Sequence, residues 1–205
     1  MKIKSLFIAT LYSVVTVFAL SSCSPKKDET VQEESHDESM HAATEETSAQ
    51  ASAPQFQVDA TFQQQLSGVF TSYVSLKESF VATNSAQVKE AANVQESLSK
   101  TDMMLLTGVA HNDWMNYSGG LKASLKEIQA SDDIEAQRTS FSKLSDNMYK
   151  SIKAYGLGGA TAFYEFCPMA FNNQGAYWLS DADEIRNPYF GDKMLKCGSV
   201  EEKLQ

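Results

Sequence analysis

The sequence predicts a mainly α protein: an antiparallel four-helix bundle with a small aromatic C-terminal appendix of short strands. Apolar side chains recur at helical spacing from Phe62 to Tyr155, and the connections between the patterned segments are short. After Gly156 the pattern changes to short aromatic runs separated by turn residues. About 150 residues follow position 55, which is enough for one domain.

The first two predicted helices differ in the regularity of their apolar stripes. In the first, the spacing is four, three, four, three and four residues, and Asp59 stands where an N-cap is expected. A weaker pattern predicts a second helix from Ser85 to about Leu106. The stripes consist of Phe62, Leu66, Val69, Tyr73, Leu76 and Phe80, and of Val88, Ala91, Gln95, Leu98 and Leu105.

A third helix is indicated around the glycine pair Gly119-Gly120. Two glycines would cost about 2 kcal/mol inside a helix, so we expect it to begin near Ser118 or to be kinked there. The apolar positions of this segment are Trp114, Tyr117, Leu121, Leu125 and Ile128.

The fourth predicted helix begins at a capping box formed by Asp132 and Glu135 and ends at Gly156. Its buried face consists of Ile134, Phe141, Leu144, Met148, Ile152 and Tyr155. In the appendix, residues 161–166 and 176–179 read as strands, with turns at 172–175 and at Asn187-Pro188.

The N-terminus indicates export. Lys2 and Lys4 precede an apolar run from Leu6 to Leu20, as in a signal peptide. Residues 20–23, Leu-Ser-Ser-Cys, resemble the lipobox of bacterial lipoproteins, in which cleavage precedes the cysteine. The resemblance implies a signal peptide over residues 1–22 and a lipidated Cys23 carrying acyl chains such as palmitate. An uncleaved anchor helix is the alternative.

The residues after Cys23 bear on its location. An Asp at position 24 would resemble an inner-membrane retention signal, and Ser24 stands there instead. Lys27-Asp28-Glu29 resembles a signal that sends some lipoproteins to the cell surface. We therefore expect a lipid anchor in the bacterial cell envelope, at the outer membrane, facing either the periplasm or the cell exterior.

Residues 23–55 form the predicted tether, which is rich in Ser, Thr, Ala, Gln and acidic residues and is expected to be disordered. It contains His36, Met40 and His41, which an alternative interpretation would use as a mobile metal-collecting arm. The net charge is −9 for the whole chain, and it becomes −11 (15 basic, 26 acidic residues) without Lys2 and Lys4. This acidity argues against nucleic acid as a partner.

Two clusters of soft donors lie in the domain 56–205. In Cys167-Pro168-Met169 the extended backbone favoured before proline lets Cys167 and Met169 face one ion. Met194 and Cys197 are three residues apart, so one helical turn places both on one face. Thiolate and thioether sulfur are the ligands that Cu(I) and other soft metal ions prefer. His111 is a further candidate ligand, if its loop folds over the appendix; the alternative is a position at a helix start beside the capping residues Asn112 and Asp113.

The same two cysteines suit a disulfide. Two well-separated cysteines in an exported domain form a disulfide more often than a metal site, and methionine is a common core filler. From spacing alone, a Cys167–Cys197 disulfide and a metal site both remain open.

A set of motifs in the second half of the domain carries a family resemblance. The motifs are Ile134-Glu135-Ala136-Gln137-Arg138, Phe141, Leu144-Ser145, Cys167-Pro168-Met169-Ala170, Gly175, Trp178-Leu179-Ser180, Ile185, Asn187-Pro188-Tyr189-Phe190-Gly191 and Met194-Leu195-Lys196-Cys197-Gly198. Together they resemble an uncharacterised domain family of bacterial envelope proteins, which occurs alone in lipoproteins and appended to periplasmic adaptor subunits of copper/silver-type RND efflux pumps. The resemblance covers the domain after the tether and is sharpest over its last 70 or so residues.

The resemblance implies an association with metal efflux and raises the metal interpretation above the disulfide. Cys167-Pro168-Met169 also resembles the start of the heavy-metal-binding motif Cys-Pro-Met-His-Pro, although Ala170 replaces its histidine and no proline follows. We therefore expect an envelope lipoprotein that binds Cu(I) or another soft ion for sequestration or hand-off, with a metal-efflux adaptor as a possible protein partner.

Catalysis finds little support in the sequence. It has no glycine-rich phosphate loop and no serine or cysteine nucleophile with a histidine at recognisable spacing, and Cys167 lacks a Cys-x-x-Cys partner. An enzyme is not expected. The alternative from another class is a metal-free protein-interaction module stabilised by the Cys167–Cys197 disulfide.

Overall fold

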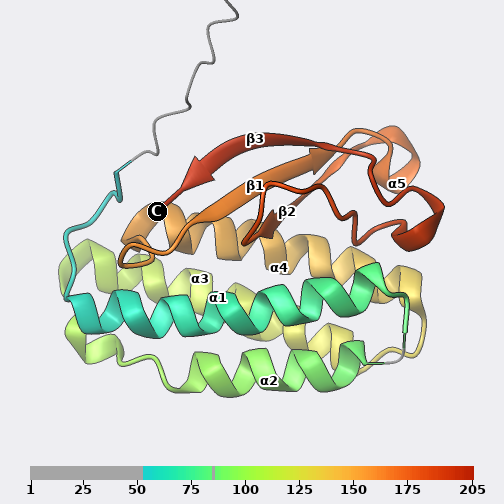
Figure 1. The fold of residues 1–205 in the computed structure, drawn as a ribbon. Helices are drawn as coiled ribbons and strands as arrows, with labels where there is room; N and C mark the ends of the chain where they lie inside the picture. The colour runs from blue at the N-terminus through green and yellow to red at the C-terminus, as the bar shows by residue number, and fades with distance from the viewer. Residues whose placement is uncertain (1–52, 85) are drawn as a thin grey trace, which may run out of the picture. The chain divides into compact units, whose positions relative to one another are not determined.

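The computed structural model describes residues 53–84 and 86–205, and four long helices make up most of them (Figure 1). The signal peptide, Cys23 and residues 23–52 of the tether lie outside the described residues. The helices are α1 (Ala60–Val81), α2 (Gln87–Ser99), α3 (Gly108–Gln129) and α4 (Ile134–Tyr155), and a short 3-10 helix, η1 (Met103–Leu105), precedes α3. No helix in the described part is both long and apolar enough to cross a membrane.

The C-terminal part forms an antiparallel three-stranded sheet in the order β2-β1-β3. Its strands are β1 (Ala162–Cys167), β2 (Ala176–Ser180) and β3 (Ser199–Leu204), with two short helical segments, α5 (Ala170–Asn173) and η2 (Gly191–Lys193), between them. A mainly helical chain with four long helices and a small C-terminal sheet is thereby confirmed. β3 was not predicted, because its largely polar, exposed residues lack an apolar alternation.

The stripe predicted for the first helix is confirmed in full. All six of its apolar residues are completely buried, and the Asp59 carboxylate accepts a hydrogen bond from the Thr61 amide at 2.7 Å. That bond satisfies one of the amides that a helix N-terminus leaves without an intrahelical partner.

The second helix was predicted too long. It ends at Ser99, seven residues before the expected Leu106, and the predicted core residue Gln95 is exposed. Val94 is buried in its place, so the apolar stripe runs through Ala91, Val94 and Leu98, at spacings of three and four. The buried face of this helix was predicted one residue too late at this point, because Gln95 lies at helical spacing from Ala91 just as Val94 does.

The expected start or kink of the third helix near Ser118 is corrected. α3 begins at Gly108 and continues through Gly119 and Gly120, so it neither starts near Ser118 nor breaks there. A Cβ on Gly120 would lie 2.5 Å from Oδ1 of Asn147 on α4, so the glycine leaves room for the end of this side chain.

The N-cap of α4 is Asp133, one residue after the predicted Asp132. Its carboxylate accepts hydrogen bonds from the amides of Glu135 (3.4 Å) and Ala136 (3.1 Å). The predicted stop at Gly156 is confirmed, with φ at +73° in the region that favours glycine. Asp132 and Asp133 are both suitable N-cap residues, and the backbone geometry of the turn places Asp133 at the N-cap.

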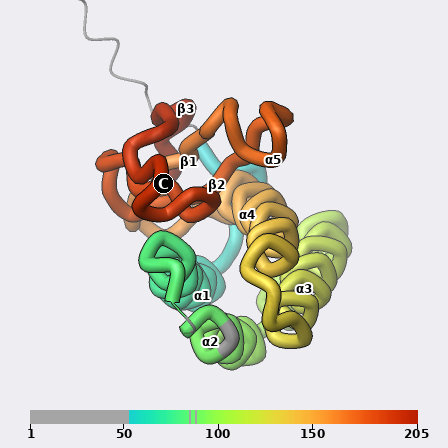
Figure 2. Tube along the Cα trace, turned by 90° about the vertical axis from the view of Figure 1, so that its right-hand side faces the viewer, coloured from blue at the N-terminus to red at the C-terminus, as the bar shows by residue number. Residues whose placement is uncertain are grey.

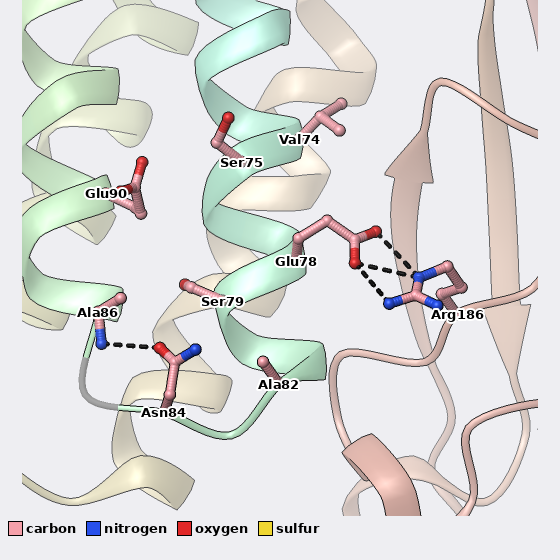
Figure 3. Close-up of a pocket in the computed structure, with 9 residues that line it drawn as sticks. All are labelled: Val74, Ser75, Glu78, Ser79, Ala82, Asn84, Ala86, Glu90 and Arg186. Atoms are coloured by element: carbon pink, nitrogen blue, oxygen red, sulfur yellow. Dashed lines mark hydrogen bonds and ion pairs between the residues drawn. The ribbon is translucent and has the colours of Figure 1, made fainter.

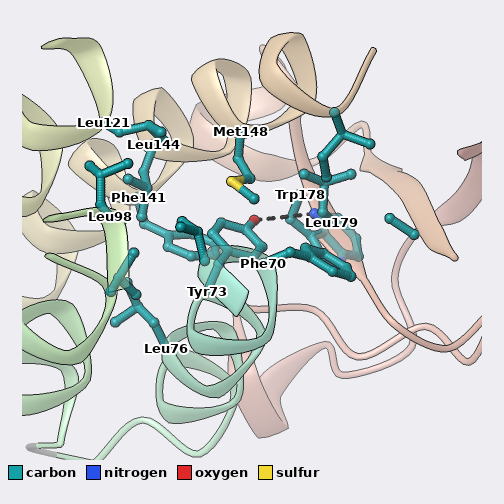
Figure 4. Packing of buried hydrophobic residues seen from close by; sticks show 14 of the residues in the cluster. Phe70, Tyr73, Leu76, Leu98, Leu121, Phe141, Leu144, Met148, Trp178 and Leu179 are labelled. Carbon is teal, nitrogen blue, oxygen red and sulfur yellow. Dashed lines mark hydrogen bonds between the residues drawn. The ribbon is translucent and has the colours of Figure 1, made fainter. Parts of the chain in front are cut away.

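The sheet and the helices share one hydrophobic core. The sheet lies over α1 and α4, while α2 and α3 lie on the other side of these helices (Figure 2). Trp178 and Leu179 of β2 belong to the same buried cluster as Tyr73 of α1 and Phe141 and Met148 of α4 (Figure 4). The C-terminal sheet is therefore an integral layer of the domain.

Candidate functional site

The two cysteines of the described domain meet. Cys167 is the last residue of β1 and Cys197 lies in the segment before β3, yet their Sγ atoms are 2.8 Å apart. Both are free thiols; Cys167 is fully buried and Cys197 is partly exposed. The fold thus brings together the two strongest soft donors identified in the sequence.

Each cysteine is held by a different part of the sheet region. Cys167 pairs with Ala176 in the β1–β2 ladder. Cys197 ends a turn in which its amide donates to the Met194 carbonyl at 3.0 Å, and its own carbonyl accepts from Nδ2 of Asn187 at 2.7 Å. The pair therefore links a strand of the sheet to a turn stabilised by side chains.

The main chain of both predicted methionine ligands reaches Cys197. The Met194 carbonyl accepts the Cys197 amide, and the Met169 amide is directed at the Cys197 thiol. The side chain of Met169 is 46% exposed, and that of Met194 is half-buried. The main chain of the predicted set Cys167, Met169, Met194 and Cys197 is therefore gathered in one region.

The environment keeps the Cys197 proton in place. Burial raises the pKa of Cys197 to about 11, and the hydrogen bond and charge of Cys167 act in the same direction, while the Met169 amide partly opposes them. At neutral pH the group is a thiol. A metal ion would have to displace this proton, so ion binding at the pair would be pH-dependent.

His111 lies far from the thiol pair. It belongs to the first turn of α3, where the neighbouring Ala110 carbonyl accepts from the Tyr155 hydroxyl at the C-terminal end of α4. The segment around the cysteines contacts the N-terminal half of α4, where the rings of Phe141 and Tyr189 are 6.0 Å apart. Phe141 and Tyr155 are about 20 Å apart along the helix at 1.5 Å per residue. The fold does not bring His111 to the cysteines.

Among the residues that the structure describes, no three His, Cys, Asp or Glu side chains are grouped closely enough to hold an ion. Any ion at the thiol pair would therefore complete its coordination with thioethers or with groups from a partner. This is the donor chemistry of a soft ion and not that of Mg²⁺ or Ca²⁺.

Sequence reasoning missed a buried polar cluster beneath the sheet. Glu165 is completely buried, and neither of its carboxylate oxygens has a hydrogen-bond partner among the described residues. Burial raises its pKa to about 8, against the opposing charge of Lys77 and the indole N–H of Trp178. Trp178 pairs with Glu165 across the β1–β2 ladder, and its Nε1 also makes no hydrogen bond of good geometry among the described residues. Lys77 is itself 1% exposed, and its Nζ lies 2.5 Å from Glu78 and 3.3 Å from the Ser180 hydroxyl. A glutamate inside the aromatic run Phe163–Phe166 was the available signal.

A groove on the surface borders this cluster, where α1 ends and α2 begins (Figure 3). It encloses about 560 Å³ and contains the ion pair of Glu78 with Arg186, whose NH2 and Nε lie 2.9 and 3.0 Å from Oε2. Arg186 stands one residue before Asn187, so this ion pair ties the segment that leads to Cys197 onto α1. The other residues that line the groove are Val74, Ser75, Ser79, Ala82, Asn84, Ala86 and Glu90.

Residues 69–159 match the family described as "Protein of unknown function (DUF3347)". The matched segment runs from within α1 to just beyond α4, so it covers the helical layer and ends before β1. The helical part is therefore similar to an uncharacterised domain family. The resemblance was expected to be sharpest over the last 70 or so residues, whereas the match ends at residue 159, so Cys167 and Cys197 lie outside it. No curated protein and no solved structure matches the chain.

Proposed function

We propose that this chain is a cell-envelope lipoprotein that binds a soft metal ion, Cu(I), at Cys167 and Cys197, for sequestration or hand-off to an efflux system. One observation carries the proposal: two thiols 30 positions apart in the sequence converge, and the main chain of both predicted methionine ligands meets them. The ion is cargo in this proposal, and no enzymatic activity is proposed.

The residues present fit a soft ion by their chemistry. Cys167 and Cys197 would supply thiolates, and Met169 and Met194 would supply thioethers. Two thiolates sharing an ion with metal–sulfur bonds of about 2.3 Å in tetrahedral geometry stand about 3.8 Å apart. Binding would therefore separate the two Sγ atoms by about 1 Å from their present 2.8 Å. Cys197 is partly exposed, so its side chain has room for this shift.

The anchor and the partner rest on the sequence. Cys23 lies outside the described residues, and its lipidation is proposed from the lipobox-like residues 20–23. A metal-efflux adaptor is proposed as partner from the family resemblance alone. The outer membrane remains the proposed location, on its periplasmic face or at the cell surface.

We also propose that the four helices pack as an antiparallel bundle. This arrangement is supported by hydrogen bonds between neighbouring helices. The Gln87 side chain at the start of α2 donates to the Ser79 carbonyl near the end of α1, and Ser97 near the end of α2 bonds Ser72 in the middle of α1. Ser140 at the start of α4 donates to Glu127 at the end of α3, and Tyr155 at the end of α4 donates to Ala110.

A second candidate function is a metal-free protein-interaction module with a Cys167–Cys197 disulfide. The specific observation in its favour is the 2.8 Å separation, which is shorter than the spacing of two ligands on one ion and close to bonding distance. In this candidate the bond forms when an oxidant in the envelope removes two electrons and the two thiol protons leave. The helical layer would then present the binding surface.

The decisive experiment is an anaerobic Cu(I) titration of the reduced full chain carrying Cys23→Ser, which removes the third thiol. We expect about one equivalent of Cu(I) to be retained against a moderate chelator. Cys167→Ser or Cys197→Ser should abolish most of this affinity, while Met169→Leu or Met194→Leu should weaken it without unfolding, since Leu and Met have similar volumes.

The chain provides matched controls. Met104 and Met115 are 81% and 50% exposed, and both lie near the start of α3. Leucine at either position should leave Cu(I) affinity unchanged. A purified chain whose mass and thiol count show Cys167 linked to Cys197, and which binds no Cu(I) after reduction, would overturn the metal proposal and favour the interaction module.

A further inference from the structure

Asn187 is a buried side chain that contacts the cysteine turn directly. It is completely buried, and its Nδ2 donates to the Cys197 carbonyl at 2.7 Å. Its Oδ1 accepts from the amides of Tyr189 (2.8 Å) and Phe190 (3.3 Å), and its backbone amide donates to the Leu195 carbonyl at 2.9 Å. One residue therefore joins its own turn to the two ends of the segment 195–197.

The turn that contains Asn187 is fixed to the helical layer. Arg138 of α4 is buried, and its Nε donates to the Pro188 carbonyl at 3.0 Å while its NH2 reaches the Thr83 hydroxyl at 3.2 Å. Gly191 has φ at +56°, and a Cβ there would lie 2.5 Å from the Thr83 hydroxyl. The amide of Asn187 is thus presented to Cys197 from a rigid support.

The position of Cys197 beside Cys167 also requires a close approach of the chain to the sheet. A Cβ on Gly198 would lie 2.8 Å from the Phe166 carbonyl and 2.8 Å from the Trp178 ring. Gly198 leaves this space free, and the Asn187 amide supplies the attachment. Cys167 is already fixed in β1, so the distance between the thiols depends on how the Cys197 turn is held.

We propose that Asn187 is the positioning residue of the cysteine pair: its side-chain amide holds the Cys197 turn so that the two thiols meet, and this sets the affinity of the pair for a soft ion. The effect on metal affinity rests on the proposed function. The effect on the thiols does not, because it concerns their proximity alone. Asn187 is not a ligand in this arrangement.

The first test measures proximity without metal. The reduced full chain carrying Cys23→Ser is equilibrated with a mixture of reduced and oxidised glutathione. When Cys167 and Cys197 form a disulfide, oxidised glutathione takes up the two electrons and two protons and becomes two molecules of reduced glutathione. Asn187→Asp keeps an acceptor for the Tyr189 and Phe190 amides but loses the donor to the Cys197 carbonyl. We expect this variant and Asn187→Ala to lower the effective concentration of one thiol at the other by roughly tenfold or more.

The second test measures Cu(I) affinity of the same variants, which should fall by about 10- to 100-fold, the range for residues that orient metal ligands. Leu98→Ala, in the core of α2, is the control for general destabilisation and should change neither readout. A shifted glutathione equilibrium in a chain that binds no Cu(I) would support the positioning role and refute only the metal function.

Three outcomes would overturn the proposal. In the first, a folded Asn187 variant keeps a glutathione equilibrium within about twofold of the parent, a difference too small to indicate positioning. In the second, Leu98→Ala shifts the equilibrium equally. In the third, both Asn187 variants fail to fold, which would mean that this residue serves the whole fold and not the cysteine pair.

Discussion

The hydroxyl of Tyr73 on α1 lies 2.7 Å from the Ser145 hydroxyl on α4, in the centre of the core. The same Tyr73 oxygen accepts the backbone amide of Leu179 on β2 at 3.2 Å (Figure 4). Two helices and one strand of the sheet are therefore joined at one buried oxygen. A polar contact of this kind specifies how the sheet sits on the helices, since an alternative placement would leave the amide unsatisfied.

Replacing Tyr73 with Phe should destabilise the fold by about 1–3 kcal/mol, because the Leu179 amide then remains buried without an acceptor. Equilibrium denaturation in urea measures the change. Tyr117→Phe, at a half-buried position on α3, is the control and should change the free energy of unfolding by less than about 0.5 kcal/mol. Equal effects of the two variants would contradict the role of Tyr73.

Two adjacent glycines of α3 should respond oppositely to alanine. A Cβ on Gly119 meets no described atom within 4 Å, so Gly119→Ala should stabilise the chain by about 0.5–1 kcal/mol through helix propensity. A Cβ on Gly120 would collide with the Asn147 side chain, which also donates to the Lys143 carbonyl. Gly120→Ala should therefore be less stable than Gly119→Ala by roughly 1–2 kcal/mol.

Thermal or urea denaturation of the two glycine variants provides the comparison. Adding Asn147→Ala should restore stability to Gly120→Ala, because the smaller side chain removes the collision. If both alanines stabilise equally, the close approach of α3 and α4 at Gly120 would be wrong.

Glu165 should make stability fall as pH rises. Its pKa is raised from 4.5 to about 8 in the fold, mainly by burial, with Lys77 opposing and Asp183 and Glu78 reinforcing the shift. The folded chain therefore binds a proton more tightly than the unfolded chain. The contribution of Glu165 is fully present below pH 4.5 and is lost progressively as the pH rises to about 8.

Glu165→Gln removes this titration and keeps the shape of the side chain. At pH 8 the variant should be more stable than the parent by up to about 4 kcal/mol, and the difference should shrink toward pH 5. Urea denaturation at several pH values measures it, with exposed Glu201→Gln as the control. A difference that does not depend on pH would refute a proton-binding role for Glu165.

Cys23→Ser should release the chain from the membrane fraction, because the proposed lipid is attached to that sulfur. Fractionation of cells and intact-mass analysis of the purified protein provide the measurement. Cys197→Ser is the control and should remain membrane-bound. Retention of the Cys23→Ser chain in the membrane would favour an uncleaved anchor helix.

The helical layer was largely predictable because its information is local. The spacing of Phe62, Leu66 and Val69 fixed the buried face of α1, and Asp59 and Gly156 marked helix ends through their own backbone chemistry. The errors at Gln95 and at Gly119-Gly120 have a different cause. In both places the outcome depends on residues that are distant in the sequence. Packing against the other helices selects the buried face of α2, and Gly120 of α3 lies against the Asn147 side chain of α4.

The candidate site was predictable in its donors and not in its supports. Cys167, Met169, Met194 and Cys197 could be selected by residue type, whereas the separation of His111 from them follows from the packing of α3 on α4. Asn187 was recognised only as a turn residue, because nothing in the sequence indicates that its amide would bond Cys197. Glu165 was missed because an acidic residue within an aromatic strand is ordinarily expected to face solvent.

The sequence by itself determined the helical class, most of the faces that the helices bury and which residues are candidate soft donors. These follow from side-chain periodicity and ligand chemistry, which act over a few residues. Only the tertiary structure decided that two thiols 30 positions apart meet at 2.8 Å, that the sheet shares the core of the helices, and that Glu165 is completely buried. Such relationships depend on contacts between distant segments, which local pattern does not encode.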